Sequence, residues 1–221
     1  MKSFFWPENT NDARAVQVAL KDKVKTIPLR KKPELIAGVD AAFSEDKVIG
    51  VICLYTYPEL TLIEEAFAVK KISFPYIPGF LSFREGPAIV EALNGLELKP
   101  DVILFDGQGI AHPKGLGLAS HIGVLLDVPT IGCAKSRLVG EYKEPGLKKG
   151  AWSPLKYHGK VVGSVLRTKD HVRPVFVSPG HRIDLRSSLE IVLGCTRKFR
   201  IPEPLRMADF VSKELKREKI G

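Results

Sequence analysis

The stretch of residues 100–123, with the sequence PDVILFDGQGIAHPKGLGLASHIG, decides the fold of this chain. Residues 102–105 form a continuous apolar run of β-favouring side chains, which predicts a strand buried on both faces. The run ends at Asp106, and a glycine-rich loop and the start of a helix follow. Ligands of open α/β sheets gather outside the carboxyl ends of such strands. Asp106 is therefore either a candidate site residue or only the cap of a turn.

The glycine spacing of this loop excludes one familiar interpretation. A dinucleotide-binding fingerprint needs a third glycine three residues after Gly109, but that position holds His112, and Pro113 follows it. A dinucleotide-binding domain of the Rossmann type is therefore not predicted.

The composition limits the class of protein. The 221 residues suffice for one sizeable domain with a full core, and we predict a single domain over residues 1–221. The net charge of +9 indicates either a polyanionic partner or a well-solvated lysine-rich surface. Three widely spaced cysteines without a CxxC pair favour a reducing cytoplasm. No membrane association is expected, because the longest apolar runs are too short to span a bilayer.

Hydrophobic periodicity places further elements around the central strand. A second short buried strand over residues 35–39 ends on Asp40, which repeats the pattern of an apolar strand followed by a carboxylate. Further strands are predicted at 47–57, 61–72, 129–134, 150–157, 161–167 and 175–177, a turn at 178–181, and helices at 10–24, from 80, from 116, at 182–193 and at 204–219. Together these elements predict a mixed α/β sheet with helices on both faces.

Carboxylates converge if the strands that end at Asp40 and Asp106 are parallel neighbours, because adjacent strands lie about 4.8 Å apart. Glu85, in the helix between them in sequence, would join from one face. Two carboxylates about 5 Å apart repel by about 3 kcal/mol at an effective dielectric of 20. Either a shared proton or a hard cation such as Mg²⁺ must compensate them. In a basic protein, this arrangement suggests metal-assisted chemistry on a phosphodiester.

Several short segments resemble the endonuclease V family, in the order in which that family carries them. They are residues 38–40 (GVD), 75–79 (PYIPG), 81–85 (LSFRE), 106–109 (DGQG), 112–113 (HP), 119–121 (ASH), 134–136 (AKS) and 177–181 (VSPGH). The resemblance covers most of the chain and is nearest to prokaryotic members. It implies a ribonuclease H-like fold and a Mg²⁺-dependent DNA repair endonuclease that recognises deoxyinosine, with Mn²⁺ as an expected substitute.

The resemblance also implies a reaction and its partners. Enzymes of this family hydrolyse the second phosphodiester on the 3′ side of deoxyinosine and leave a 3′-hydroxyl and a 5′-phosphate. The expected partner is DNA with deoxyinosine or other deaminated bases, bound by a cytoplasmic monomer. An inosine-specific ribonuclease of the same fold remains an alternative, because the sequence does not measure a preference for the 2′-hydroxyl. A non-catalytic nucleic-acid-binding module is the other alternative, and the retained carboxylates argue against it.

The resemblance assigns roles to the charged residues of the site. Asp40 and Asp106 match the metal-binding carboxylates of the family, and Glu85 matches its third acidic residue. Lys135 matches a lysine close to the scissile phosphate; an ordinary surface lysine is the alternative, but its place at a strand exit favours membership of the site. Asp209 falls where some relatives carry a histidine, and we hypothesise that it helps to hold a second metal ion.

The remaining predicted site residues concern the base. Tyr76 matches the residue beside the displaced base, and Tyr76 and Ile77 between Pro75 and Pro78 would form a rigid wedge that separates base steps. A proline-rich turn packed on the core is the alternative. The predicted base pocket consists of Gly79, Leu81, Gly109, Gly117 and His121.

Overall fold

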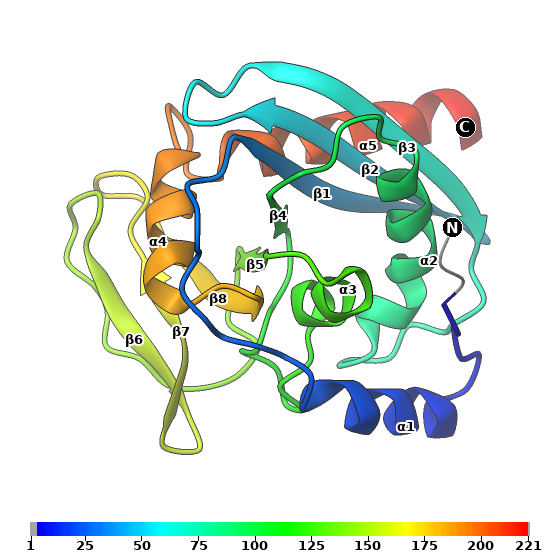
Figure 1. Cartoon of the computed structure of the whole chain (residues 1–221), viewed down its shortest axis with the longest axis horizontal. Helices are drawn as coiled ribbons and strands as arrows, with labels where there is room; N and C mark the ends of the chain where they lie inside the picture. Colours follow the sequence, from blue (N-terminus) through cyan, green and yellow to red (C-terminus); the bar gives the residue numbers. More distant parts are fainter. Residues whose placement is uncertain (1–3, 221) are drawn as a thin grey trace.

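Eight strands form one sheet in the computed structural model, which describes residues 4–220 of the chain (Figure 1). The strands are β1 (Leu35–Ser44), β2 (Lys47–Thr56), β3 (Leu62–Lys71), β4 (Val102–Phe105), β5 (Thr130–Ala134), β6 (Trp152–Tyr157), β7 (Lys160–Leu166) and β8 (Val175–His181). The helices are α1 (Thr10–Lys21), α2 (Leu81–Asn94), α3 (Leu118–Leu126), α4 (Leu185–Gly194) and α5 (Glu203–Ile220).

The sheet has the strand order β3-β2-β1-β4-β5-β8-β7-β6. The pairs β1–β4 and β4–β5 are parallel, and the other five pairs are antiparallel. Figure 1 shows the helices arranged around this sheet, with the short strands β4 and β5 at its centre. The predicted mixed sheet is confirmed. The strands that lead to Asp40 and Asp106, β1 and β4, are the parallel neighbours that convergence of the carboxylates requires, and the predicted strands at 150–157 and 161–167 pair as a hairpin.

Helices cover both faces of the central strands. Side chains of β1 alternate between the faces, so Ala37 and Val39 pack with α2 and α3, whereas Ile36 packs with α4 and α5. Burial on both faces explains why the central strands read as continuous apolar runs instead of alternating ones. None of the helices within residues 4–220 has the length and apolarity needed to cross a membrane.

Two strands are longer than predicted. β1 does not end at Asp40 but continues to Ser44, because β2 pairs with it along its full length, with Asp40 opposite Val51. β8 likewise runs through residues 178–181, where a turn is predicted, because β5 pairs with it as far as His181 across a register shift. The two errors have the same cause. A charged residue, a proline or a glycine interrupts the apolar pattern of the sequence, but it does not interrupt the hydrogen-bonded pairing of the strands.

The packing partner of the first helix decides which of its faces is buried. Asn9 caps it by accepting hydrogen bonds from the backbone amides of Asn11 and Asp12 at 3.1 and 3.0 Å. Ala13 and Gln17 are buried, whereas Val18 is 62% exposed. The helix packs on an aromatic cluster of the 74–83 region, so that cluster decides which side faces inward.

Two glycines allow helix backbones to approach the sheet from opposite sides. A Cβ atom at Gly38 of β1 would lie 2.2 Å from the carbonyl carbon of Pro204 in α5. At Gly50 of β2, a Cβ atom would lie 2.7 Å from the carbonyl carbon of Ala88 in α2. Because both neighbours are backbone atoms, α5 and α2 sit closer to these strands than any side chain would permit.

We expect the substitution Gly38→Ala to lower the free energy of unfolding by about 1–3 kcal/mol, because the added methyl group forces α5 away from β1. Urea unfolding followed by circular dichroism measures this change. Gly146→Ala is the control, since its Cβ atom would lie 3.4 Å from the Ala151 Cβ, an ordinary contact. Equal stability of the Gly38 variant and the wild type would contradict this account of the packing.

Candidate active site

Asp40 and Asp106 meet where the parallel pairing of β1 and β4 ends. The register places Val39 opposite Phe105, so each carboxylate comes one residue after the last pair. The backbone amide of Asp106 donates to the Val39 carbonyl at 3.4 Å, which keeps the two chains together at this point. Both carboxylates, with Glu85 from α2, line one cavity of about 180 Å³, which we call the acidic cavity. The strand register thus brings Asp40 and Asp106 together, and α2 adds Glu85 to them.

Burial and mutual repulsion act on these carboxylates. Glu85 is only 8% exposed, and burial raises its pKa to about 8, with further upward contributions from Asp40 and Asp106. The pKa of Asp40 is also raised, mainly by burial, although a hydrogen bond from Ser212 opposes this shift. Glu85 therefore carries a proton at neutral pH unless a cation compensates the negative charge around it.

The chemistry of this donor set fits a hard cation, because Mg²⁺ prefers carboxylate oxygens. Within the described part of the chain, however, no three His, Cys, Asp or Glu side chains are spaced to hold an ion. Lys135 provides the compensating charge instead. Its Nζ lies 2.5 Å from Asp106 Oδ2 and 3.6 Å from Asp209 Oδ1. Lys135 thus pairs with two of the predicted acids, Asp106 and Asp209.

Asp209 reaches the site from α5 and is shared between two lysines. Its Oδ2 accepts a hydrogen bond from Lys213 Nζ at 2.6 Å, one helical turn further along. Burial raises the pKa of Asp209, but Lys213 and Lys135 outweigh it, and the net shift is downward. Burial lowers the pKa of Lys135, but Asp106 and Asp209 raise it further, so the net shift is upward. Both shifts favour the charged forms of an ion-pair network beside the acidic cavity.

Ser212 is a site residue that the sequence analysis missed. It is 1% exposed, and its Oγ donates a hydrogen bond to Asp40 Oδ2 at 2.6 Å. The contact joins two residues 172 positions apart, so no local pattern announces it. It fixes the orientation of the Asp40 carboxylate and favours its ionised form.

A second cavity, of about 420 Å³, adjoins the first and shares Asp106 and Leu118 with it. We call it the wedge cavity. Of the predicted residues, it is lined by Tyr76, Ile77, Pro78, Gly79, Leu81, Gly117 and Lys135. Its lining also includes residues to which the sequence analysis gave no role, among them Gln108, His112 and Arg137. Gln108 belongs to the DGQG motif and His112 to the HP motif, so both could have been found from the sequence, and Arg137 directly follows the AKS motif.

The predicted wedge has an exposed tip and an anchored side. Tyr76 is 72% exposed, and Pro75 and Pro78 are exposed on either side of it. Ile77 instead packs against the aromatic cluster beneath the loop. Ile77 therefore fits the alternative of a turn packed on the core, whereas the role of Tyr76 in a wedge stays a prediction.

Two residues predicted to form the base pocket lie outside its wall. Gly109 has no room for a Cβ atom, which would lie 2.0 Å from the Pro179 carbonyl oxygen, so it serves packing against β8. His121 is 1% exposed, and its Nδ1 lies 2.9 Å from Ser82 Oγ. Burial lowers the pKa of His121 to about 4, so the imidazole is neutral. Because Ser82 lines the wedge cavity, His121 supports that wall from behind.

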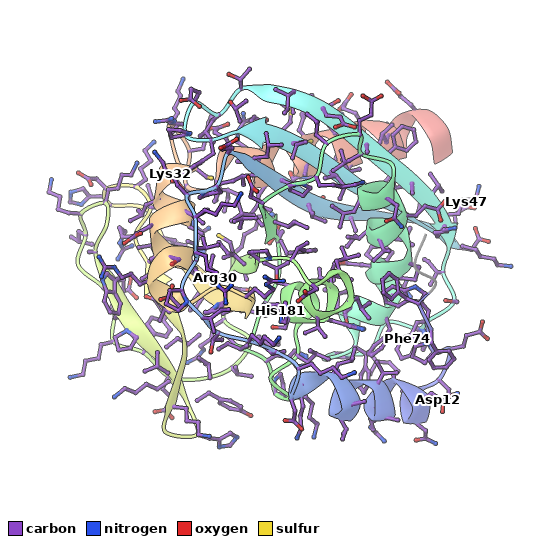
Figure 2. The ribbon with its side chains drawn as sticks, in the orientation of Figure 1. Asp12, Arg30, Lys32, Lys47, Phe74 and His181 are labelled. Carbon is purple, nitrogen blue, oxygen red and sulfur yellow. The ribbon has the colours of Figure 1, made fainter. Side chains whose placement is uncertain are left out.

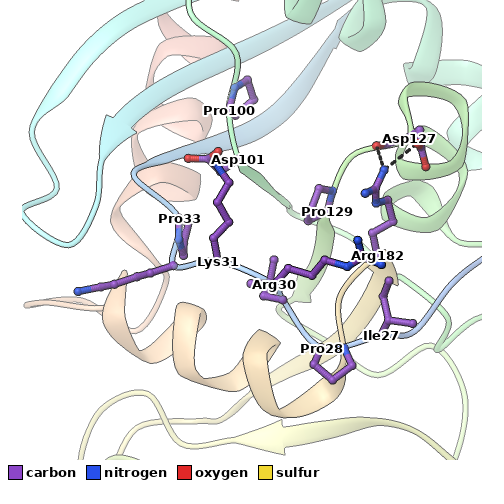
Figure 3. Close-up of a pocket in the computed structure, with 12 residues that line it drawn as sticks. Ile27, Pro28, Arg30, Lys31, Pro33, Pro100, Asp101, Asp127, Pro129 and Arg182 are labelled. Carbon is purple, nitrogen blue, oxygen red and sulfur yellow. Dashed lines mark hydrogen bonds and ion pairs between the residues drawn. The ribbon is translucent and has the colours of Figure 1, made fainter.

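A third cavity, of about 350 Å³, lies at the opposite end of the central strands, beside the residues that precede β4 and β5 (Figure 3). Arg30 and Lys31 line it, but its two carboxylates serve the fold. Asp101 Oδ2 accepts two backbone amides at the start of β1, at 2.9 and 3.0 Å. Asp127 Oδ2 accepts a hydrogen bond from Arg182 at 2.7 Å. This cavity offers no spare acid for catalysis.

An acidic cavity beside a second, larger cavity is an arrangement that suits a nuclease, an enzyme that hydrolyses phosphodiester bonds. Comparison with known proteins narrows the class, because the sequence profile of the endonuclease V family matches residues 18–210. Endonuclease V of Dictyoglomus turgidum is 50% identical over 199 residues, which cover 90% of this chain and 85% of that protein. The chain belongs to the endonuclease V family.

Solved structures agree with this assignment. Endonuclease V from Streptomyces avermitilis superposes with a TM-score of 0.94 at 41% identity, covering 98% of this chain and 96% of that one. Endonuclease V of Ciona intestinalis, in complex with DNA containing an inosine followed by a ribo-adenosine, superposes with a TM-score of 0.82 at 32% identity over 94% of this chain and 97% of that one. The resemblance and the predicted ribonuclease H-like fold are confirmed.

We expect Ser212→Ala to shift the acidic limb of the pH–rate profile to higher pH, because Asp40 loses the hydrogen bond that lowers its pKa. A shift of one pH unit corresponds to an about tenfold loss of rate on that limb. Cleavage rates between about pH 5 and pH 9 measure it. Ser188→Ala in α4 is the matched control, since its buried hydroxyl bonds only to the backbone of Asp184. An unchanged profile would refute the role of Ser212.

We expect the stability of the protein in EDTA to fall as the pH rises through about 8. The pKa of Glu85 is raised from 4.5 to about 8 in the fold, so its stabilising contribution is complete below the unfolded value and is lost as pH rises through the folded one. Glu85→Gln should remove this loss, which amounts to several kcal/mol. Urea unfolding between about pH 5 and pH 9 tests it, with Glu91→Gln on the same helix as control. Parallel curves for wild type and Glu85→Gln would contradict the assignment.

Proposed function

We propose that this protein is a DNA repair endonuclease that recognises deoxyinosine and hydrolyses the second phosphodiester on its 3′ side. The observation that carries the proposal is the adjacency of the two cavities, which share Asp106 and Leu118. When a base is held in the wedge cavity, the DNA strand that carries it lies beside the carboxylates. The DNA in the Ciona intestinalis complexes, which contains an inosine, supports the choice of base.

Recognition begins with separation of the base from its neighbours. Tyr76, at the exposed tip of the loop, would fill the space that the displaced base leaves. Removing a base from the stack costs a few kcal/mol, and least for a mispaired base, so deoxyinosine and other deaminated bases are favoured before any specific contact forms. Gly79, with φ of +83° on the cavity wall, leaves room for the base where a side chain would not.

The chemistry belongs to the acidic cavity. Asp40, Asp106 and Glu85 would hold Mg²⁺, for which Mn²⁺ substitutes, and Asp209 would contribute to a second ion. When bound, the metal polarises the phosphoryl oxygen and lowers the pKa of the attacking water. Lys135, already within reach of Asp106, would balance the charge that develops on the phosphoryl oxygens. The products carry a 3′-hydroxyl and a 5′-phosphate.

The cellular setting follows from the same proposal. We propose that the protein acts as a monomer in the cytoplasm, where deaminated DNA of a prokaryote is accessible. The three cysteines, Cys53, Cys133 and Cys195, are buried free thiols, which suits a reducing compartment.

A second candidate substrate is RNA that contains inosine. The observation in its favour is that the inosine in the Ciona intestinalis complexes is followed by a ribonucleotide. A non-catalytic binding role has no such support, because a pure binder gains nothing from buried carboxylates that face phosphates.

We expect a duplex with one deoxyinosine to be nicked in Mg²⁺ and not in EDTA, while the matched normal duplex stays intact. Asp106→Asn should lower the rate by about 100-fold or more, because the residue loses a charge that the metal and Lys135 both need. Denaturing gel electrophoresis of end-labelled strands measures rate and position together.

The control variant is Asp46→Asn, an exposed acid in the turn between β1 and β2. It should cleave at the wild-type rate. Faster cleavage of a matched inosine-containing RNA would move the function to RNA, and binding without cleavage of either would refute the nuclease proposal.

A further inference from the structure

The loop of residues 74–79, which carries Tyr76, is held at both ends by side chains from two helices. At its start, Arg84 of α2 donates from Nη1 to the Phe74 carbonyl at 2.9 Å. At its end, Gln17 of α1 donates from Nε2 to the Gly79 carbonyl at 2.8 Å. The loop is therefore tied by its backbone, independently of the side chains at its tip.

The Gln17 contact is not a by-product of surface packing. The side chain is 2% exposed, although α1 is otherwise largely exposed, and it bonds to a residue 62 positions away. A buried amide is stable only where it finds a partner, and its removal takes from the Gly79 carbonyl the donor that comes from α1. Gln17 lines neither the acidic nor the wedge cavity. Its only described hydrogen bond is thus to the rim of the wedge cavity.

The inner side of the loop rests on an aromatic cluster. The rings of Phe74 and Phe83 lie 5.6 Å apart, and Ala13 of α1 and Ile77 pack against them. Figure 2 shows Phe74 between α1 and α2. With Ile77 anchored and both ends tied, Tyr76 is the large apolar side chain that the loop presents outward.

Gly79 connects this support to the wedge cavity, because it accepts the hydrogen bond from Gln17 and lines the cavity wall. Its φ of +83° is a conformation that glycine adopts freely, so the peptide that follows it has no side chain to fix its direction. The Phe80 amide of the same peptide donates to the Ile77 carbonyl at 3.0 Å within the loop, and the hydrogen bond from Gln17 ties this peptide to α1. Without that bond, this end of the loop is no longer tied to α1, and the loop holds Tyr76 less rigidly.

We propose that Gln17 is a positioning residue for base displacement, which acts through Tyr76 and not on the phosphodiester. The inference rests on the proposed recognition of deoxyinosine. Its consequence is selective, because a rigid wedge is needed only where the target base must leave a paired, stacked duplex. Single-stranded DNA that contains deoxyinosine requires no such separation.

The test compares cleavage of a deoxyinosine duplex with cleavage of the same single strand, in Mg²⁺. Gln17→Met keeps the length of the side chain and removes the donor, and Val18→Ala on the exposed side of α1 is the matched control. We expect Gln17→Met to lower kcat/KM about tenfold on the duplex, the size of one lost hydrogen bond. On the single strand it should stay within about twofold of wild type, because no wedge is needed there. Equal losses on both substrates would show a general structural defect and overturn the proposal.

A double-mutant cycle tests the route through Tyr76. In the Tyr76→Ala background, Gln17→Met should cause no further loss on the duplex, because the side chain it positions is gone. Additive losses would mean that Gln17 acts elsewhere. Gln17→Asn, which keeps the amide but is one methylene shorter, serves as the second variant if Gln17→Met does not fold.

A binding measurement separates this inference from the proposed function. Fluorescence of 2-aminopurine beside the deoxyinosine, in EDTA, reports unstacking without cleavage, and we expect a rise with wild type that Gln17→Met reduces at least about twofold. A wild-type rise that the variant retains would overturn only the role of Gln17. No rise with wild type would overturn base displacement, and the role of Gln17 with it.

Discussion

The close approach of two helix backbones to the first two strands is the constraint on which the site depends. Gly38 admits α5 against one face of β1, and Gly50 admits α2 against the other face of β2. α5 thereby brings Ser212 to Asp40, and α2 brings Glu85 to the same cavity. A side chain at either glycine would separate the groups that must act together, although neither glycine has any chemistry of its own.

The arrangement of carboxylates is unfavourable in isolation, and the fold compensates it locally. Burial raises the pKa values of Glu85 and Asp40, which means that ionising them in place costs free energy. For Asp40, the Ser212 hydroxyl at 2.6 Å and the nearby charge of Lys135 offset part of that cost. A cation bound among these acids would offset the rest of the cost, which fits the metal-assisted chemistry proposed for the site.

Local sequence patterns predicted those features of the fold that depend on residues close to one another in the sequence. The apolar runs before Asp40 and Asp106 predicted two parallel strands, and their register carried the carboxylates together. Ser212 and Gln17 were beyond such reasoning, because their partners lie 172 and 62 residues away. Gly109 and His121 were misplaced because a motif gives proximity along the chain and not the direction of a side chain. The family resemblance supplied the wedge, but only the packing of Ile77 shows which half of it is free.

The two cavities are connected through the first turns of α2. Arg84 braces the loop of Tyr76 through the Phe74 carbonyl, and the next residue, Glu85, lines the acidic cavity. Consecutive residues of a helix point about 100° apart, so one rigid turn serves both sites. The guanidinium of Arg84 also lies 4.7 Å from the ring of Phe43 in β1, the strand that carries Asp40. A loop fixed to the same elements as the carboxylates keeps a constant distance from them, and the proposed cleavage at a set number of phosphodiesters from the lesion requires a constant distance.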